Sequence, residues 1–105
     1  MKITEIIIRK AFSDENNSLK AIVSIVIDGV LAVHDIKIID KENKFFIAMP
    51  SRKDSDGIFR DIVHPINCDT REFLECEILD EYMRFLGRRR ILEEINDVPD
   101  FVNKD

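Results

Sequence analysis

Basic side chains recur along the second half of the chain, where they could contact the phosphates of a nucleic acid. Arg52 and Lys53 open a polar run, Arg60 follows shortly after it, and Arg71 lies at the start of a helical pattern. Lysine and arginine contact phosphate through charge and through hydrogen bonds. The alternative is ordinary surface charge and complementation of a helix dipole. The same alternatives apply to a denser arginine cluster further along: Arg84, Arg88, Arg89 and Arg90.

The charge balance limits this interpretation, because the whole chain carries a net charge of −5. Residues 1–65 carry ten basic and ten acidic groups, whereas residues 66–105 carry six basic and eleven acidic groups. A nucleic-acid surface would therefore be a local basic patch on an acidic protein. Arg71 shows the ambiguity, since a cation in the first helical turn opposes the helix dipole. It is either paired with a neighbouring carboxylate or held there for a ligand.

The two histidines and two cysteines are the candidates for catalysis or metal binding. His34 adjoins Asp35, as a general base and its orienting carboxylate would. Cys68 follows His64, which would suit a cysteine–histidine nucleophile, but a turn histidine beside a small polar residue explains both. Cys68 and Cys76 are eight residues apart, about 12 Å along a helix, which is too far to share one ion. We therefore expect no enzyme, no catalytic residue, no cofactor and no metal.

The first two thirds of the chain predict antiparallel strands joined by polar turns. Asp28-Gly29 is a strong hairpin signal, because both turn positions tolerate positive φ. The polar run Asp40–Asn43 predicts a second turn, and Ser51–Gly57 contains no apolar residue and is expected to be an exposed loop. The expected strands are Lys2–Phe12, Leu19–Ile27, Val30–Ile39 and Lys44–Met49, with a short fifth strand at Ile58–Val63.

The last third predicts one long amphipathic helix. Asp69 precedes Glu72 by three residues, which resembles a capping box, and Gly87 is expected to end the helix. The fold class is therefore α+β: an antiparallel sheet of four or five strands with one C-terminal helix. Residues 1–87 form the single domain, and residues 88–105 a basic-then-acidic tail with room for a short helical turn. One apolar stripe follows the helical period: Phe73, Leu74, Ile78, Tyr82, Phe85 and Leu86.

One helix can cover only one face of such a sheet, and this points to self-association. The run Ile6–Ile8 places apolar side chains on both faces of its strand. We therefore expect a homodimer that forms through the sheet. No apolar stretch approaches the roughly 20 residues of a membrane span, and the N-terminal residues do not predict a signal peptide. The expected location is the cytoplasm.

A series of motifs in the middle of the chain is more specific than any of these patterns. In order they are Ala48-Met49-Pro50-Ser51-Arg52-Lys53, Asp56-Gly57, Phe59-Arg60-Asp61-Ile62, His64-Pro65-Ile66-Asn67 and Asp69-Thr70-Arg71. Upstream stand Lys20-Ala21-Ile22-Val23-Ser24-Ile25 and Val33-His34-Asp35-Ile36-Lys37-Ile38-Ile39. Together they resemble the stage V sporulation protein G family of bacteria, over residues 1–86.

The resemblance implies a small cytoplasmic bacterial protein, dimeric, with a sheet and a helix, and linked to septum formation and sporulation. It also implies binding to DNA and, in some members, to RNA. The basic loop and the helix are the contact elements that the resemblance implies. On this sequence they correspond to Arg52, Lys53, Arg60 and Arg71.

The chain departs from the family pattern at the loop itself. Asp54 and Ser55 stand where the family usually has Thr-Pro, so the loop is freer and a negative charge lies beside Arg52 and Lys53. Beyond Leu86 the sequence shows no resemblance to the family pattern, so Arg88–Arg90 are expected to be a feature of this chain alone. DNA binding is then weaker here, shifted to the arginine cluster, or absent.

Two functions of different classes follow. The first is a dimeric nucleic-acid-binding regulator of septation and sporulation. The alternative is a protein-interaction module of the cell-division machinery that does not bind nucleic acid directly. In that case the acidic face of the helix or the edge of the sheet would contact the partner protein. An enzyme built on His64 and Cys68 remains a third hypothesis with little support.

Overall fold

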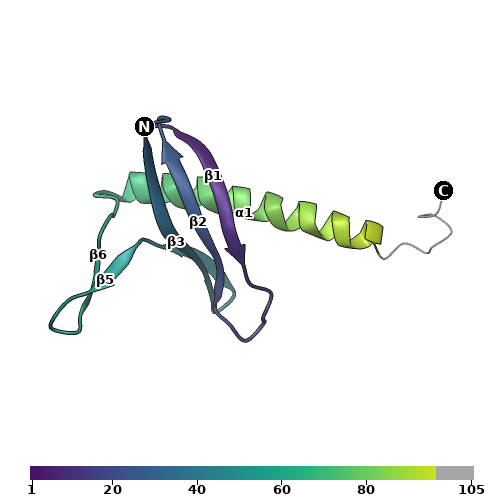
Figure 1. Cartoon of the computed structure of the whole chain (residues 1–105), viewed down its shortest axis with the longest axis horizontal. Coiled ribbons are helices and arrows are strands. Elements are labelled where there is room, and N and C mark those ends of the chain that lie inside the picture. Colours follow the sequence, from purple (N-terminus) through teal and green to yellow (C-terminus); the bar gives the residue numbers. More distant parts are fainter. Residues whose placement is uncertain (97–105) are drawn as a thin grey trace.

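The computed structural model describes the backbone of residues 1–96 and the side chains of residues 1–88 (Figure 1). Six strands precede one helix. In chain order they are β1 (Ile3–Ala11), β2 (Leu19–Ile27), β3 (Leu31–Lys41), β4 (Lys44–Ala48), β5 (Ser51–Lys53), β6 (Phe59–Asp61) and α1 (Cys68–Asn96). The α+β fold class is confirmed, with four consecutive strands in one antiparallel sheet in the order β1-β2-β3-β4.

Both predicted turns of the main sheet are present, and their backbone geometry explains their sequences. Asp28 and Gly29 have φ values of 53° and 70°, and the Val30 N–H donates to the Ile27 carbonyl at 3.0 Å. Glu42 and Asn43 connect β3 to β4 with φ values of 56° and 62°. Two consecutive residues with positive φ are typical of the type I′ turn, whose twist matches that of the flanking strands.

The chain after β4 differs from the prediction. The expected loop Ser51–Gly57 begins with strand β5, and the expected strand Ile58–Val63 is extended only at Phe59–Asp61. These two strands pair with each other in a separate two-stranded sheet, so no fifth strand joins the main sheet. All six of their residues are exposed, which is why the segment lacks the apolar alternation of a core strand. We call β5, β6 and their loop the hairpin; it projects away from the main sheet (Figure 1).

Helix α1 begins earlier than predicted. Asn67 is the capping residue, because its Oδ1 accepts a hydrogen bond from the Thr70 N–H at 2.8 Å, and its carbonyl accepts one from the Arg71 N–H. The predicted cap, Asp69, lies inside the first turn. Asparagine and aspartate cap helices about equally well, and an aspartate in the first turn still interacts favourably with the helix dipole.

The helix also ends later than predicted. It continues through Gly87 to Asn96. A glycine inside a helix costs only about 1 kcal/mol relative to alanine, and the arginine, leucine and glutamate residues that follow are good helix formers. Residues 97–105, the end of the predicted tail, lie outside the described residues. Within residues 1–96, no helix has the length and apolar character that crossing a membrane requires.

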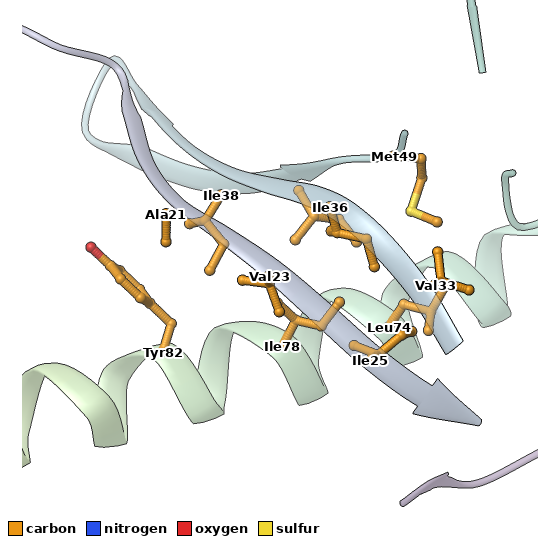
Figure 2. Packing of buried hydrophobic residues seen from close by; sticks show 11 residues of the cluster. Ala21, Val23, Ile25, Val33, Ile36, Ile38, Met49, Leu74, Ile78 and Tyr82 are labelled. Atoms are coloured by element: carbon orange, nitrogen blue, oxygen red, sulfur yellow. The ribbon is translucent and has the colours of Figure 1, made fainter. Parts of the chain in front are cut away.

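The core lies between α1 and one face of the main sheet (Figure 2). Leu74, Ile78 and Tyr82, four residues apart, form the buried row of the helix, and the Tyr82 ring lies 5.9 Å from the ring of Phe45. Phe73, predicted to be part of this row, is 36% exposed because it lies beside the row. The sheet contributes apolar side chains from three strands: Ala21, Val23, Ile25, Val33, Ile36, Ile38 and Ile47.

The other face of the main sheet has no second layer among residues 1–96. Ile7 points to this face, since it pairs directly with Ser24 while the neighbouring Val23 and Ile25 point into the core. Ile7 remains 39% exposed. One-sided coverage of the sheet thus agrees with the prediction from the sequence.

Candidate nucleic-acid interface

The loop of the hairpin is a tight turn whose sequence accounts for its shape. The Gly57 N–H donates to the Asp54 carbonyl at 3.0 Å, and the Asp54 N–H donates to the Ile58 carbonyl at 2.9 Å. Gly57 has a φ of 83°, a conformation that glycine adopts without strain. Aspartate at the first position and glycine at the fourth are typical of a type I turn. In three-residue hairpin loops such a turn usually ends in a residue in the left-handed region, which here is Gly57.

The register of the hairpin places two arginines opposite each other. Arg52 pairs with Arg60, and Lys53 pairs with Phe59. Directly paired side chains share a face, so one face of the ribbon carries both guanidinium groups and the other carries the ammonium group and the ring. Like charges directly opposite each other destabilise a strand pair. An anion bound between the two arginines would relieve this repulsion.

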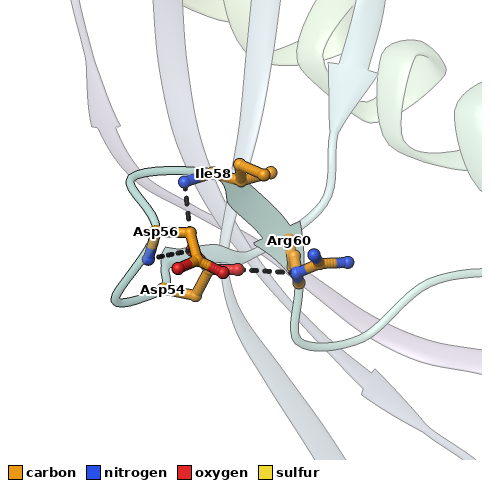
Figure 3. Close-up of polar contacts among 4 residues, drawn as sticks. All are labelled: Asp54, Asp56, Ile58 and Arg60. Atoms are coloured by element: carbon orange, nitrogen blue, oxygen red, sulfur yellow. Dashed lines mark hydrogen bonds and ion pairs between the residues drawn. The ribbon is translucent and has the colours of Figure 1, made fainter.

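Asp54 compensates part of that charge and also holds the loop (Figure 3). Its Oδ2 lies 2.7 Å from Nε of Arg60, while its Oδ1 accepts hydrogen bonds from the N–H groups of Asp56 and Ile58 at 2.9 and 3.1 Å. The Arg60 guanidinium, followed by the Ile58 N–H, holds the pKa of the Asp54 carboxyl below its ordinary value of 3.8. The side chain of Arg60 remains 68% exposed, so its outer nitrogens face solvent.

The other two cations of the hairpin are less engaged. The Lys53 ammonium lies 5.9 Å from the centroid of the exposed Phe59 ring. Among the described side chains, neither Lys53 nor Arg52 forms an ion pair. Residues 51–61 nevertheless contain three basic and three acidic residues, so any attraction for an anion depends on how the charges are arranged. A hollow of about 410 Å³ is lined by Arg52, Lys53, Asp54, Ser55, Arg60, Asp61 and Ile62.

Arg71, the fourth predicted contact residue, connects α1 to the main sheet. Its Nη2 donates to the carbonyl of Ile47 on β4 at 3.0 Å, and its Nε lies 3.5 Å from Oε1 of Glu75. Of the two alternatives that the sequence left open, the structure contains the pairing with a carboxylate. Three of the four predicted residues therefore lie together on the hairpin, and the fourth lies on the helix.

The additional arginine cluster is partly neutralised within the helix. Arg84 Nε and Arg88 Nη2 lie 3.1 and 3.4 Å from the two carboxylate oxygens of Glu81. The side chains of Arg89 and Arg90 lie outside the described residues. Two of the four arginines thus share one counter-ion.

The two histidine candidates have hydrogen-bond partners, and the two cysteines are free and exposed. Ser24 Oγ and His34 Nδ1 share a hydrogen bond at 2.8 Å, and Ser24 is only 2% exposed. This pair could not be predicted from the sequence, because a bulge in β3 at His34 and Asp35, where Asp35 has a φ of 63°, sets the register. His64 Nδ1 donates to the Pro65 carbonyl at 3.0 Å. Among the described residues, no group of three or more histidine, cysteine or acidic side chains could hold a metal ion.

A second surface was missed by sequence reasoning. The segment from Ile58 to Ile66, which we call the apolar segment, exposes five large side chains. The sequence predicts a strand here that Pro65 ends, and only three of its residues are extended. The apolar run is visible in the sequence, but nothing there indicates that it lies outside the core. The exposed fractions are 51% for Ile58, 68% for Phe59, 63% for Ile62, 41% for Val63 and 87% for Ile66.

Comparison with known proteins gives one consistent family. The family model described as SpoVG matches residues 1–84. A relative from Acetivibrio thermocellus is 52% identical over 82 residues, 78% of this chain and 85% of that protein. One from Clostridium kluyveri is 47% identical over 94 residues, 90% of this chain and 96% of that protein. A match of this length extends beyond Leu86, where the sequence alone showed no resemblance to the family. One from Caldanaerobacter subterraneus subsp. tengcongensis is 54% identical over 82 residues, 78% of this chain and 88% of that protein. All three are called "Putative septation protein SpoVG", a name that refers to septation and to no reaction.

The ion pair of the hairpin predicts a specific pH dependence. Because the pKa of Asp54 is lowered in the folded state, the stabilisation by its carboxylate is present above pH 3.8 and is lost as the pH falls through the lowered pKa. A pH titration of the Asp54 side-chain carbonyl carbon by NMR should give a midpoint below 3.8. In Arg60→Gln the midpoint should rise towards that value. A midpoint that is the same in both proteins would contradict the assignment of Arg60 as the main cause.

Proposed function

The chain belongs to the SpoVG family, and we propose that it regulates septation and sporulation as a dimeric nucleic-acid-binding protein of the cytoplasm. Its ligand is DNA, and RNA is a second ligand of the same surface. The family and its link to septation rest on the matched residues and on the names of the relatives. The binding function is supported by the geometry of the hairpin.

The observation that carries the proposal is the pair of arginines on one face of an exposed ribbon. Arg52 and Arg60 lie directly opposite each other; their like charges repel, Asp54 offsets part of this repulsion, and a bound anion would offset more of it. Phosphate suits this position, since guanidinium groups bind it with two parallel hydrogen bonds. A two-stranded ribbon also fits the major groove of DNA. Lys53 on the opposite face then adds a second phosphate contact.

The remaining arginines have a smaller role in this proposal. Arg71 donates to the main chain of β4 and pairs with Glu75, and Arg84 and Arg88 share Glu81. Each of these side chains has a carboxylate partner, as Arg60 has in Asp54, but none of them lies directly opposite a second arginine on a paired strand, as Arg60 lies opposite Arg52. We therefore assign the primary contact to the hairpin and a secondary contact to the helix.

Two uncovered apolar surfaces support the dimer. One is the apolar segment with its five exposed side chains, and the other is the exposed side chain of Ile7 on the face of the main sheet opposite α1. Contiguous exposed apolar side chains usually mark a protein interface. A second copy that covers these surfaces would also present a second hairpin to the same nucleic acid.

Removal of the two unpaired cations tests the nucleic-acid function. Arg52→Ala combined with Lys53→Ala should weaken binding to short random duplex DNA and to random single-stranded RNA, measured by fluorescence anisotropy. The slope of log affinity against log salt should decrease by about 0.9 for each DNA phosphate that the variant no longer neutralises, and by about 0.7 for each phosphate of the single strand. The loss of affinity should be similar for all sequences, because phosphate contacts carry no base information.

The matched control removes the same charge from a different pair of strands, β3 and β4 of the main sheet. Lys41 and Lys44 also form a directly opposed basic pair, at the turn between β3 and β4. Lys41→Ala combined with Lys44→Ala should leave the salt slope close to that of the wild type. Equal losses of affinity in both double variants would mean that only net charge matters and would contradict the assigned contact. Wild-type binding that is undetectable at low salt would contradict the function itself.

The dimer is tested by two substitutions at equally exposed positions. Ile66 in the apolar segment is 87% exposed, and Val30 in the turn between β2 and β3 is 86% exposed. Ile66→Asn should increase the dissociation constant of the dimer in sedimentation-velocity experiments, whereas Val30→Asn should not. If the wild type is monomeric, the dimer is wrong. The apolar segment would then favour the alternative function, a module that binds another protein of the division machinery.

A further inference from the structure

Asp54 is an acidic residue in the middle of the proposed phosphate-binding surface, where simple electrostatics makes it unfavourable. Its contacts suggest a different role. The carboxylate takes only Nε of Arg60, at 2.7 Å, and leaves the four N–H donors of the two outer nitrogens unused by this contact. Arg60 is 68% exposed while the side chain of Asp54 is 28% exposed. The side chain of Asp54 is therefore less accessible to solvent than that of Arg60.

The carboxylate is itself fixed by the loop. Its other oxygen accepts hydrogen bonds from two backbone N–H groups, those of Asp56 and Ile58, at 2.9 and 3.1 Å (Figure 3). The loop backbone is closed at both ends by hydrogen bonds between main-chain groups of Asp54, Gly57 and Ile58. The orientation of Arg60 is thus tied through one carboxylate to the backbone of a tight turn.

We propose that Asp54 is a positioning residue for nucleic-acid binding, which holds Arg60 beside Arg52 so that its outer nitrogens face a phosphate. This inference rests on the proposed function and assigns the phosphodiester backbone as the ligand of the oriented guanidinium group. Free arginine side chains lose conformational entropy when they bind, and a side chain held in place beforehand loses less. Asp54 also offsets the repulsion between the opposed arginines while no ligand is bound.

The opposite role for Asp54 makes the opposite prediction. If the carboxylate competed with phosphate for Arg60, or only lowered the local positive charge, its removal would strengthen binding. If it positions Arg60, its removal weakens binding even though the hairpin becomes more positive. The sign of the change therefore decides between the two roles.

The experiment compares two substitutions that remove one negative charge from the same loop. Asp54→Asn keeps an oxygen for the two backbone N–H groups and loses the ion pair with Arg60. Asp56→Asn is the matched control, because its side chain forms no ion pair among the described residues. With labelled random duplex DNA at low salt, Asp54→Asn should weaken binding by roughly two- to tenfold, the range expected when one long side chain must be ordered on binding. Asp56→Asn should bind as tightly as the wild type or more tightly.

A double-mutant cycle separates positioning from a general loss of hairpin structure. In an Arg60→Gln background, Asp54→Asn should no longer weaken binding, because the residue that it positions is gone. Weakening that persists in this background would overturn the proposal in favour of a structural role for Asp54. Tighter binding by Asp54→Asn in the wild-type background would overturn it in favour of competition.

The results that would overturn the positioning role of Asp54 differ from those that would overturn the proposed function. If the wild type binds with a steep salt dependence and Asp54→Asn binds more tightly, the function stands and the positioning role is wrong. If the wild type shows no salt-dependent binding to duplex DNA or to single-stranded RNA, both are wrong.

Discussion

Helix α1 covers one face of a four-stranded sheet, and this one-sided packing determines which parts of the chain remain available to partners. Leu74, Ile78 and Tyr82 cover the inner face, so burial of apolar surface stabilises the sheet and the helix together. The hairpin contributes no side chain to this core. It is held by pairing of its own strands, by a tight turn and by the Asp54–Arg60 ion pair. Its charged side chains are therefore positioned by local interactions.

The sequence predicted those parts of the fold that depend on local pattern. Positive φ at Asp28 and Gly29 is required by the turn type, and apolar runs bounded by polar turns identified the four main strands to within two residues at each end. The helix was predicted from its apolar period, but its ends were not. Asn67 and Asp69 are equally suitable caps, and Gly87 permits either a stop or a continuation. Only the hydrogen bonds and packing of the folded chain select between such alternatives.

The residues of the proposed site were singled out from the sequence, but their arrangement in space was not. Arg52, Lys53 and Arg60 were singled out from charge and from the family resemblance, and the structure brings these three together on one ribbon. From the sequence, the negative charge of Asp54 was expected to act on its chain neighbours Arg52 and Lys53. In the structure its ion pair is with Arg60, across the turn. Cross-strand partners depend on the register. No periodic signal specifies the register when every side chain of a short ribbon is exposed.

The most direct test of the account is to locate the nucleic-acid contact on the full chain. Chemical-shift changes in the ¹⁵N-labelled protein should be followed by NMR as short duplex DNA or single-stranded RNA is added. If the hairpin contacts the nucleic acid, the largest changes should fall on the backbone amides of Arg52, Lys53 and Arg60 and decrease as salt is added. Changes confined to the acidic face of α1 or to the uncovered face of the sheet would show that the hairpin is not the contact surface.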